Sequence, residues 1–130
     1  KSMRRLGIAL GMASGLMLVL SSAAHSLLGW KQLSADIAKT NAPPDLVRGL
    51  AIGWHFGGLA MLIFGILVLG LFANALRGNT LPAVPVLVIG LGYLAFGIGA
   101  LAVTGFDPFF MVFVVPGLLL LIGASLVRKS

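Results

Sequence analysis

The sequence has no cysteine and very little charge. The absence of cysteine among 130 residues excludes a disulfide framework and the Cys-x-x-Cys enzymes that exchange thiols with quinones. Only 9% of the residues are charged, whereas a soluble domain has about 25%. The hydrophobic share of 59% and the mean hydropathy of +1.11 also exclude intrinsic disorder, which requires low hydrophobicity and high charge. This composition is typical of an integral membrane protein.

Acidic and basic side chains are missing from four long apolar segments. A membrane-spanning helix needs about 20 mostly apolar residues, and each segment has close to that number or more. The segments are Leu6–Gly29, Gly49–Leu76, Leu81–Phe106 and Phe109–Val127. We therefore predict an all-α polytopic membrane protein with a single domain over residues 1–130. The expected architecture is an antiparallel bundle of four transmembrane helices at about 6–29, 49–76, 81–106 and 109–127, with an outer loop over residues 30–48.

The basic residues are distributed unequally between the segment ends. On one side the sequence places Lys1, Arg4, Arg5, Arg77, Arg128 and Lys129. On the other side it places Lys31, Lys39, Arg48 and all the acids, Asp36, Asp45 and Asp107. The positive-inside rule then predicts that both termini are cytoplasmic. The net charge of +6 is explained by this topology and by contact with anionic lipids, so no nucleic-acid partner is expected.

Glycine recurs at every fourth position in the first two segments. The two rows are Gly7, Gly11 and Gly15, and Gly49, Gly53 and Gly57, with Gly65 further along the second row. Small residues let membrane helices approach closely, so both rows are predicted to be helix-packing seams within the bundle or a homo-oligomer. A glycine-lined cavity is the alternative. Pro85 and Pro116 fall inside the third and fourth segments, where they are predicted to kink the helices.

Two histidines are the ionisable side chains inside the predicted spans that titrate near neutral pH. His25 and His55 lie at similar depths below the outer surface, and Trp54 and Asp107 belong to the same layer. Intramembrane ionisable groups are rare and often functional. The layer is therefore the candidate ligand or lipid site. A metal or haem iron held by His25 and His55 is an alternative, and purely structural hydrogen bonding is another.

The sequence offers little that would support enzymatic catalysis. No carboxylate lies within a span, no paired carboxylates suggest hydrolysis, and Ser21, Ser22 and His25 lack an acid to complete a triad. The leading hypothesis is a non-enzymatic binding or scaffolding protein with a site near His25 and His55. The alternatives are a b-type haem or metal-binding electron carrier, and a small-solute transporter or channel subunit that pivots at Pro116. The expected partners are membrane lipids and either a second copy or a larger membrane complex.

Three short stretches carry a resemblance to known proteins. They are the Arg4-Arg5 entry to the first segment, the Ala24-His25 pair near its end and Gly53-Trp54-His55 in the second segment. With these features the chain resembles small four-helix bacterial inner-membrane proteins. It is also loosely similar to the DoxX-like group in size, helix count and a glycine-rich first span. The resemblance implies a location in a bacterial plasma membrane and implies no particular activity.

Overall fold

The computed structural model describes residues 1–128 and is almost entirely helical. Its elements are α1 (Ser2–Ala23), the π-helix η1 (Ala24–Gly29), α2 (Trp30–Ile37), α3 (Pro44–Leu76), α4 (Ala83–Val103), the 3-10 helix η2 (Pro108–Phe110) and α5 (Met111–Arg128). Four stretches are long and apolar enough to cross a membrane, with α1, η1 and α2 forming one of them. The prediction of an all-helical chain with four such helices is confirmed. These four helices indicate a multi-pass membrane protein.

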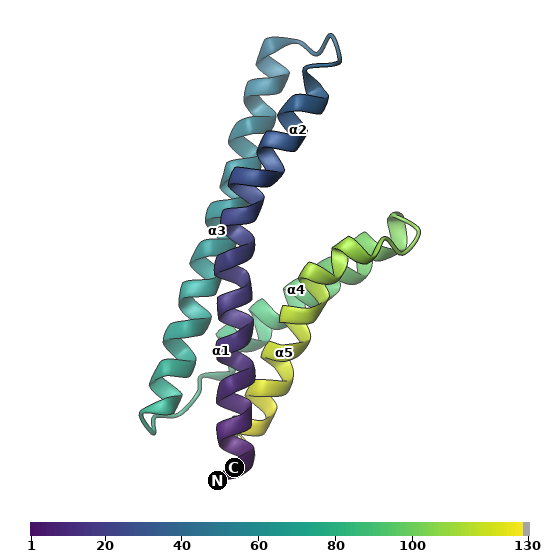
Figure 1. The fold of residues 1–130 in the computed structure, drawn as a ribbon. Coiled ribbons are helices and arrows are strands. Elements are labelled where there is room, and N and C mark those ends of the chain that lie inside the picture. Colours follow the sequence, from purple (N-terminus) through teal and green to yellow (C-terminus); the bar gives the residue numbers. More distant parts are fainter. Residues whose placement is uncertain (129–130) are drawn as a thin grey trace.

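The chain forms two helical hairpins of unequal length. The long hairpin comprises residues 2–76, and the short hairpin comprises residues 83–128. Helix α1 packs against both α3 and α5, and α4 packs against α5. The two hairpins lie together at the end where α1 begins and α5 ends, here called the base, and they diverge away from it (Figure 1). The result is a V-shaped arrangement in which α1 and α5 form the contact between the hairpins.

The segment over residues 30–48, where an outer loop is predicted, is mostly helical in the structure. Residues Trp30–Ile37 continue the first helix, and α3 already begins at Pro44. Nothing between residues 30 and 37 breaks a helix, whereas Pro43 and Pro44 force the chain to leave the first helix and suit the start of the next. The continuous stretches of 36 and 33 residues are about 50 Å long, which exceeds the roughly 30 Å of membrane hydrocarbon.

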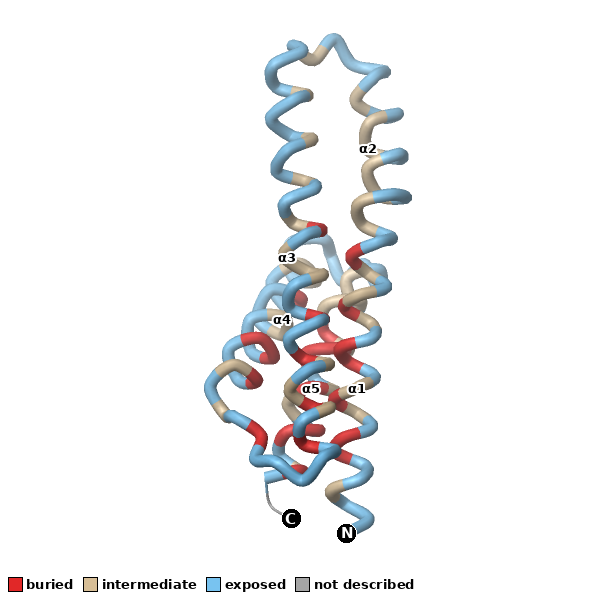
Figure 2. The backbone as a smooth tube through the Cα atoms, turned by 90° about the vertical axis from the view of Figure 1, so that its left-hand side faces the viewer, coloured by how far each residue is buried: buried red, intermediate tan, exposed pale blue. Residues whose placement is uncertain are grey.

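The buried core lies at the base of the molecule. Phe72, Leu18 and Leu120 are among the side chains fully buried there, and they come from α3, α1 and α5. Figure 2 shows buried positions concentrated where the four long helices meet, while the far end of the long hairpin is exposed or half-buried. The distal half of the long hairpin is defined as η1, α2 and residues 44–57. It has no buried residue in the described structure.

The first glycine row lies inside this core. A side chain at Gly7 would meet the backbone oxygen of Gly123, a side chain at Gly11 would overlap the Phe72 ring, and one at Gly15 would press on Leu69. These positions allow α1 to approach α5 on one side and α3 on the other. Because lipid solvates apolar groups as well as a neighbouring helix does, such close packing is what draws membrane helices together.

The two prolines have different structural positions. Pro116 lies inside α5, fully buried, and its carbonyl accepts a hydrogen bond of 2.8 Å from the Ser14 hydroxyl of α1. Pro85 is only the third residue of α4. The prediction that Pro85 kinks a helix is wrong, since an amide in the first turn has no acceptor within the helix and its loss costs nothing there.

The C-terminal end of α3 is closed by a glycine turn and by an arginine from α1. Gly78 adopts a φ of 93°, and the amide of Asn79 bonds back to the carbonyl of Asn74 at 3.2 Å. The Arg4 guanidinium donates to the carbonyl of Ala75 at 2.9 Å and to that of Asn79 at 3.3 Å. A cation is favoured here because helix carbonyls without partners concentrate negative potential at a C-terminus.

Replacing Arg4 with methionine is expected to destabilise this end of α3 by about 1 kcal/mol, because two carbonyls lose a charged donor. Backbone amide exchange over residues 74–79 should rise about fivefold when measured by mass spectrometry in nanodiscs. Arg5→Met is the matched control, since Arg5 is exposed and its side chain has no hydrogen bond to any of residues 1–128. Equal exchange in the two variants would contradict the capping role.

Candidate functional site

His25 and Trp54 form a reciprocal pair across the long hairpin. Their rings stack with centroids 4.2 Å apart and planes 6° from parallel. The Trp54 indole Nε1 donates to the His25 carbonyl at 2.7 Å, and His25 Nε2 lies 2.9 Å from the Trp54 carbonyl. Because a carbonyl oxygen only accepts, Nε2 must carry a proton. Each residue therefore binds the backbone of the other, in addition to the ring contact.

The local backbone makes this pair possible. His25 lies in η1, the π-helical segment, where the wider turn shifts the register of the helix after Ala23. Glycines on both helices allow the close approach: a side chain at Gly29 would meet the Trp54 ring at 2.9 Å, and one at Gly58 would overlap the Ser26 hydroxyl. Neither the π-helix nor the role of Gly58 was predicted from the sequence.

His55 has a different partner from His25. It is exposed, and its ring lies against Trp30 of α2 with centroids 5.6 Å apart at an angle of 57°. Each histidine thus contacts a tryptophan of the opposite helix. Of the four predicted site residues, the structure brings His25 and Trp54 into direct contact. It places His55 in a separate ring contact, with Trp30, in the same hairpin.

Asp107 belongs to the short hairpin. Its carboxylate accepts a hydrogen bond of 2.9 Å from the Phe109 amide and so caps η2. It forms no part of the described lining around His25. The expectation that Asp107 shares one layer with the two histidines therefore overlooked the divergence of the hairpins, which the sequence does not encode in any local pattern.

The pairing bears on whether the histidines could hold a metal or haem. Within residues 1–128 no group of three or more His, Cys, Asp or Glu side chains is placed to hold a metal ion. Haem ligation by histidine requires a free ring nitrogen directed at the iron. His25 Nε2 is engaged by a carbonyl, and the ring face is covered by Trp54. His55 contacts Trp30 instead, so no ring contact between the two histidines is present among residues 1–128.

An open groove lies beside the His25–Trp54 pair. It has a volume of about 520 Å³, and its lining comprises His25, Asp45, Leu46, Gly49, Leu50, Gly53, Trp54 and Gly57. A side chain built at Gly49 or Gly53 would meet nothing within 4 Å among the described residues, and one at Gly57 would meet only His25 Nε2, at 3.4 Å. The second glycine row therefore differs from the first: its outer two members pack against no helix of the described chain.

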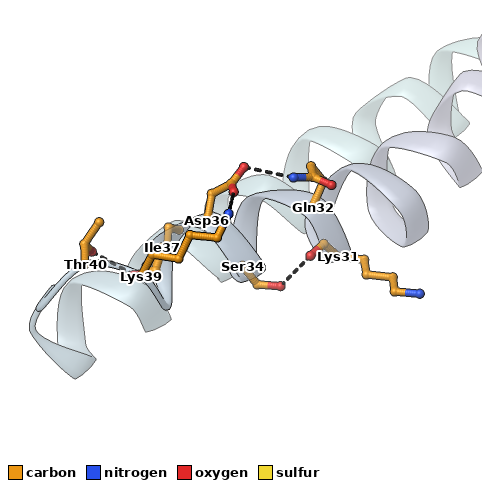
Figure 3. Close-up of polar contacts among 7 residues, drawn as sticks. All are labelled: Lys31, Gln32, Ser34, Asp36, Ile37, Lys39 and Thr40. Atoms are coloured by element: carbon orange, nitrogen blue, oxygen red, sulfur yellow. Dashed lines mark hydrogen bonds and ion pairs between the residues drawn. The ribbon is translucent and has the colours of Figure 1, made fainter.

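The tip of the long hairpin carries a small polar cluster (Figure 3). Lys39 donates to Asp36 at 2.7 Å, and Gln32 donates to the same carboxylate at 3.0 Å. The Lys39 and Asp36 side chains are 74% and 51% exposed, so this ion pair contributes little stability. The cluster marks the change from an apolar to a polar helix surface beyond Trp30.

Comparison with protein-family models, with curated proteins and with solved structures gives no match to this chain.

Proposed function

We propose that this chain is a non-enzymatic scaffolding protein of a bacterial plasma membrane, and that it acts as a self-associated pair. Both termini lie in the cytoplasm, and the tip of the long hairpin lies on the outer side. The excess of basic residues at the base, among them Arg4, Arg5 and Arg77, supports this orientation. The position of the His25–Trp54 pair supports a first helix that reaches from one interface to the other. His25 is about 35 Å along the helix from Ser2, close to the far interface of a 30 Å core, where tryptophan is favoured.

The observation that carries the proposal is the unfilled groove along Gly49 and Gly53. In the first row every glycine is pressed against another helix, whereas these two have open space around them. A glycine row with four-residue spacing lets a second helix approach a backbone closely. The same row on a second copy can meet it across a two-fold axis, because each copy then presents the surface that it receives. The occupant that we propose is accordingly α3 of a second copy.

Disulfide trapping in nanodiscs tests the association, since the native chain has no cysteine to interfere. Leu50 lines the groove, and a Leu50→Cys variant is expected to form covalent dimers under mild oxidation. Adding Gly53→Ile should lower the dimer yield at least fivefold, because the branched side chain holds the two backbones apart.

Gly70→Ile is the matched control, because Gly70 also has open space but lies on α3 outside the groove. It should leave the dimer yield unchanged. A Leu50→Cys variant that stays monomeric would overturn the proposal. An unchanged dimer yield after adding Gly53→Ile would also overturn it and would indicate that lipid fills the groove.

A further inference from the structure

The two hairpins leave an apolar cleft between them where they diverge. It has a volume of about 240 Å³ and is lined by residues of α3, α4 and α5. Its aromatic lining includes Phe64 and Phe96, which are 39% and 61% exposed because no described part of the chain covers them. This cleft is separate from the groove beside His25, and none of its lining residues is shared with that groove.

Tyr93 is the one residue lining this cleft that carries a side-chain hydroxyl. Tyr93 is the single tyrosine of the chain, is half-buried, and contacts Phe64 edge-on with ring centroids 6.3 Å apart. Its hydroxyl makes no hydrogen bond to any of residues 1–128, and it is not enclosed by them, so it is open to whatever surrounds the described chain. In hydrocarbon no water replaces the missing partner, so a hydroxyl left alone there is unfavourable.

The depth of Tyr93 limits what could satisfy the hydroxyl. It lies at the middle of α4, about 15 Å along the helix from either end. For a helix of 21 residues crossing a core about 30 Å thick, that position is near the bilayer midplane. The ester and phosphate groups of ordinary lipids lie at the two surfaces, and only their acyl chains reach this depth. A partner for the hydroxyl must therefore bring a polar group on an otherwise apolar body, and an acceptor oxygen suits the one proton that the phenol can donate.

We propose that the cleft between α3 and the short hairpin binds a planar lipophile with a carbonyl oxygen, and that Tyr93 donates a hydrogen bond to that oxygen. The aromatic rings around Tyr93 supply flat apolar walls: Phe113 lies 6.2 Å from Tyr93 and 5.0 Å from Phe96, centroid to centroid. Gly92 leaves the floor of the cleft open, since a side chain there would meet nothing within 4 Å among the described residues. The cleft holds the planar head while an alkyl tail continues into the bilayer.

A pair of probes that differ in one oxygen tests this site in nanodiscs. The probes are 2-undecanoylnaphthalene, an aryl ketone, and 2-undecylnaphthalene, which has the same carbon skeleton without the carbonyl. Their affinities are measured from naphthyl fluorescence. We expect the ketone to bind saturably and about tenfold more tightly, which is the usual net contribution of one hydrogen bond. Tyr93→Phe should remove this difference and leave the affinity for the hydrocarbon unchanged.

A second variant separates the site from general effects on the fold. Gly92→Leu should fill the cleft and abolish binding of both probes, while Gly99→Leu, at an equally open position of α4 outside the cleft, should bind as the unmodified protein does. With 3-fluorotyrosine at the single tyrosine, one fluorine resonance should shift on ketone addition. Equal affinity for the two probes, no effect of Tyr93→Phe, or normal binding by Gly92→Leu would each overturn the proposal and indicate a cleft filled by acyl chains alone.

Discussion

Replacing Gly123 with valine is expected to separate the two hairpins. A side chain at Gly123 would begin 2.7 Å from the carbonyl oxygen of Gly7 and 3.0 Å from the amide nitrogen of Gly11. Both neighbours are backbone atoms, so no rotamer change can relieve the clash. Overpacking of a core costs about 1–3 kcal/mol even where side chains can adjust, and here α1 and α5 must move apart as rigid helices.

The expected consequence is loss of the contact that joins the hairpins. The Ser14 hydrogen bond to the Pro116 carbonyl lies along the same α1–α5 interface and should be lost with it. Purified Gly123→Val should unfold at least 10 °C below the unmodified protein when its thermal midpoint is measured by loss of the monodisperse peak in size-exclusion chromatography. Gly99→Val, which introduces the same side chain where α4 has open space, should keep the normal midpoint. Equal midpoints for the two variants would show that the α1–α5 contact does not hold the hairpins together.

The hydropathy of the sequence was sufficient to predict four membrane-crossing helices, because hydrocarbon accepts only backbone whose polar groups are satisfied internally. The ends of those helices were harder to predict. Residues 30–37 are polar enough to leave the membrane, and this change of polarity was the basis for predicting that an outer loop begins at Trp30. The structure continues the helix to Ile37, since leaving the membrane does not by itself break a helix and no proline or glycine intervenes.

The face of α3 that meets α1 shows a second limit of pattern analysis. The sequence drew attention to Gly49, Gly53 and Gly57, which are spaced by four, and to Gly65 further along the same row. The glycines that press on the first helix are Gly65 and Gly58, which is not in that row; they are spaced by seven and lie against Val19 and Ser26. Both spacings bring glycines to one helix face, so spacing alone could not decide which face packs within the chain.

The histidines illustrate a third limit. Equal depth on neighbouring helices suggested that His25 and His55 could meet, but adjacent residues such as Trp54 and His55 point about 100° apart around a helix. Only one of them can face α1 directly, and the structure places Trp54 there. The extra residue of the π-helix then decides which side chain of the first helix Trp54 meets. A π-helix has no sequence signature strong enough to be predicted here.

Replacing Trp54 with alanine is expected to loosen the distal half of the long hairpin while leaving the base intact. The distal half has no buried residue in the described structure, so few apolar contacts oppose its opening. The His25–Trp54 pair supplies a ring stack, worth about 0.5–1.5 kcal/mol, and hydrogen bonds, each worth a similar amount. Its removal should increase amide exchange over residues 24–37 at least tenfold, with no change around Gly7.

A double-mutant cycle identifies the pair as the cause. With His25→Ala and Trp54→Ala, the free energies of opening taken from exchange should show a coupling of about 1–3 kcal/mol, because each single variant already removes most of the interaction. Trp30→Ala is the matched control. It removes the same ring from the same hairpin, but Trp30 contacts His55 at 5.6 Å and 57° and makes no side-chain hydrogen bond within residues 1–128. Its effect on exchange should be several times smaller.

If Trp30→Ala opened the hairpin as much as Trp54→Ala, or if the coupling were close to zero, general loss of aromatic surface would account for the stability of the distal half. The expected contrast instead makes the reciprocal pair the element that keeps α2 and α3 aligned beside the groove along Gly49 and Gly53.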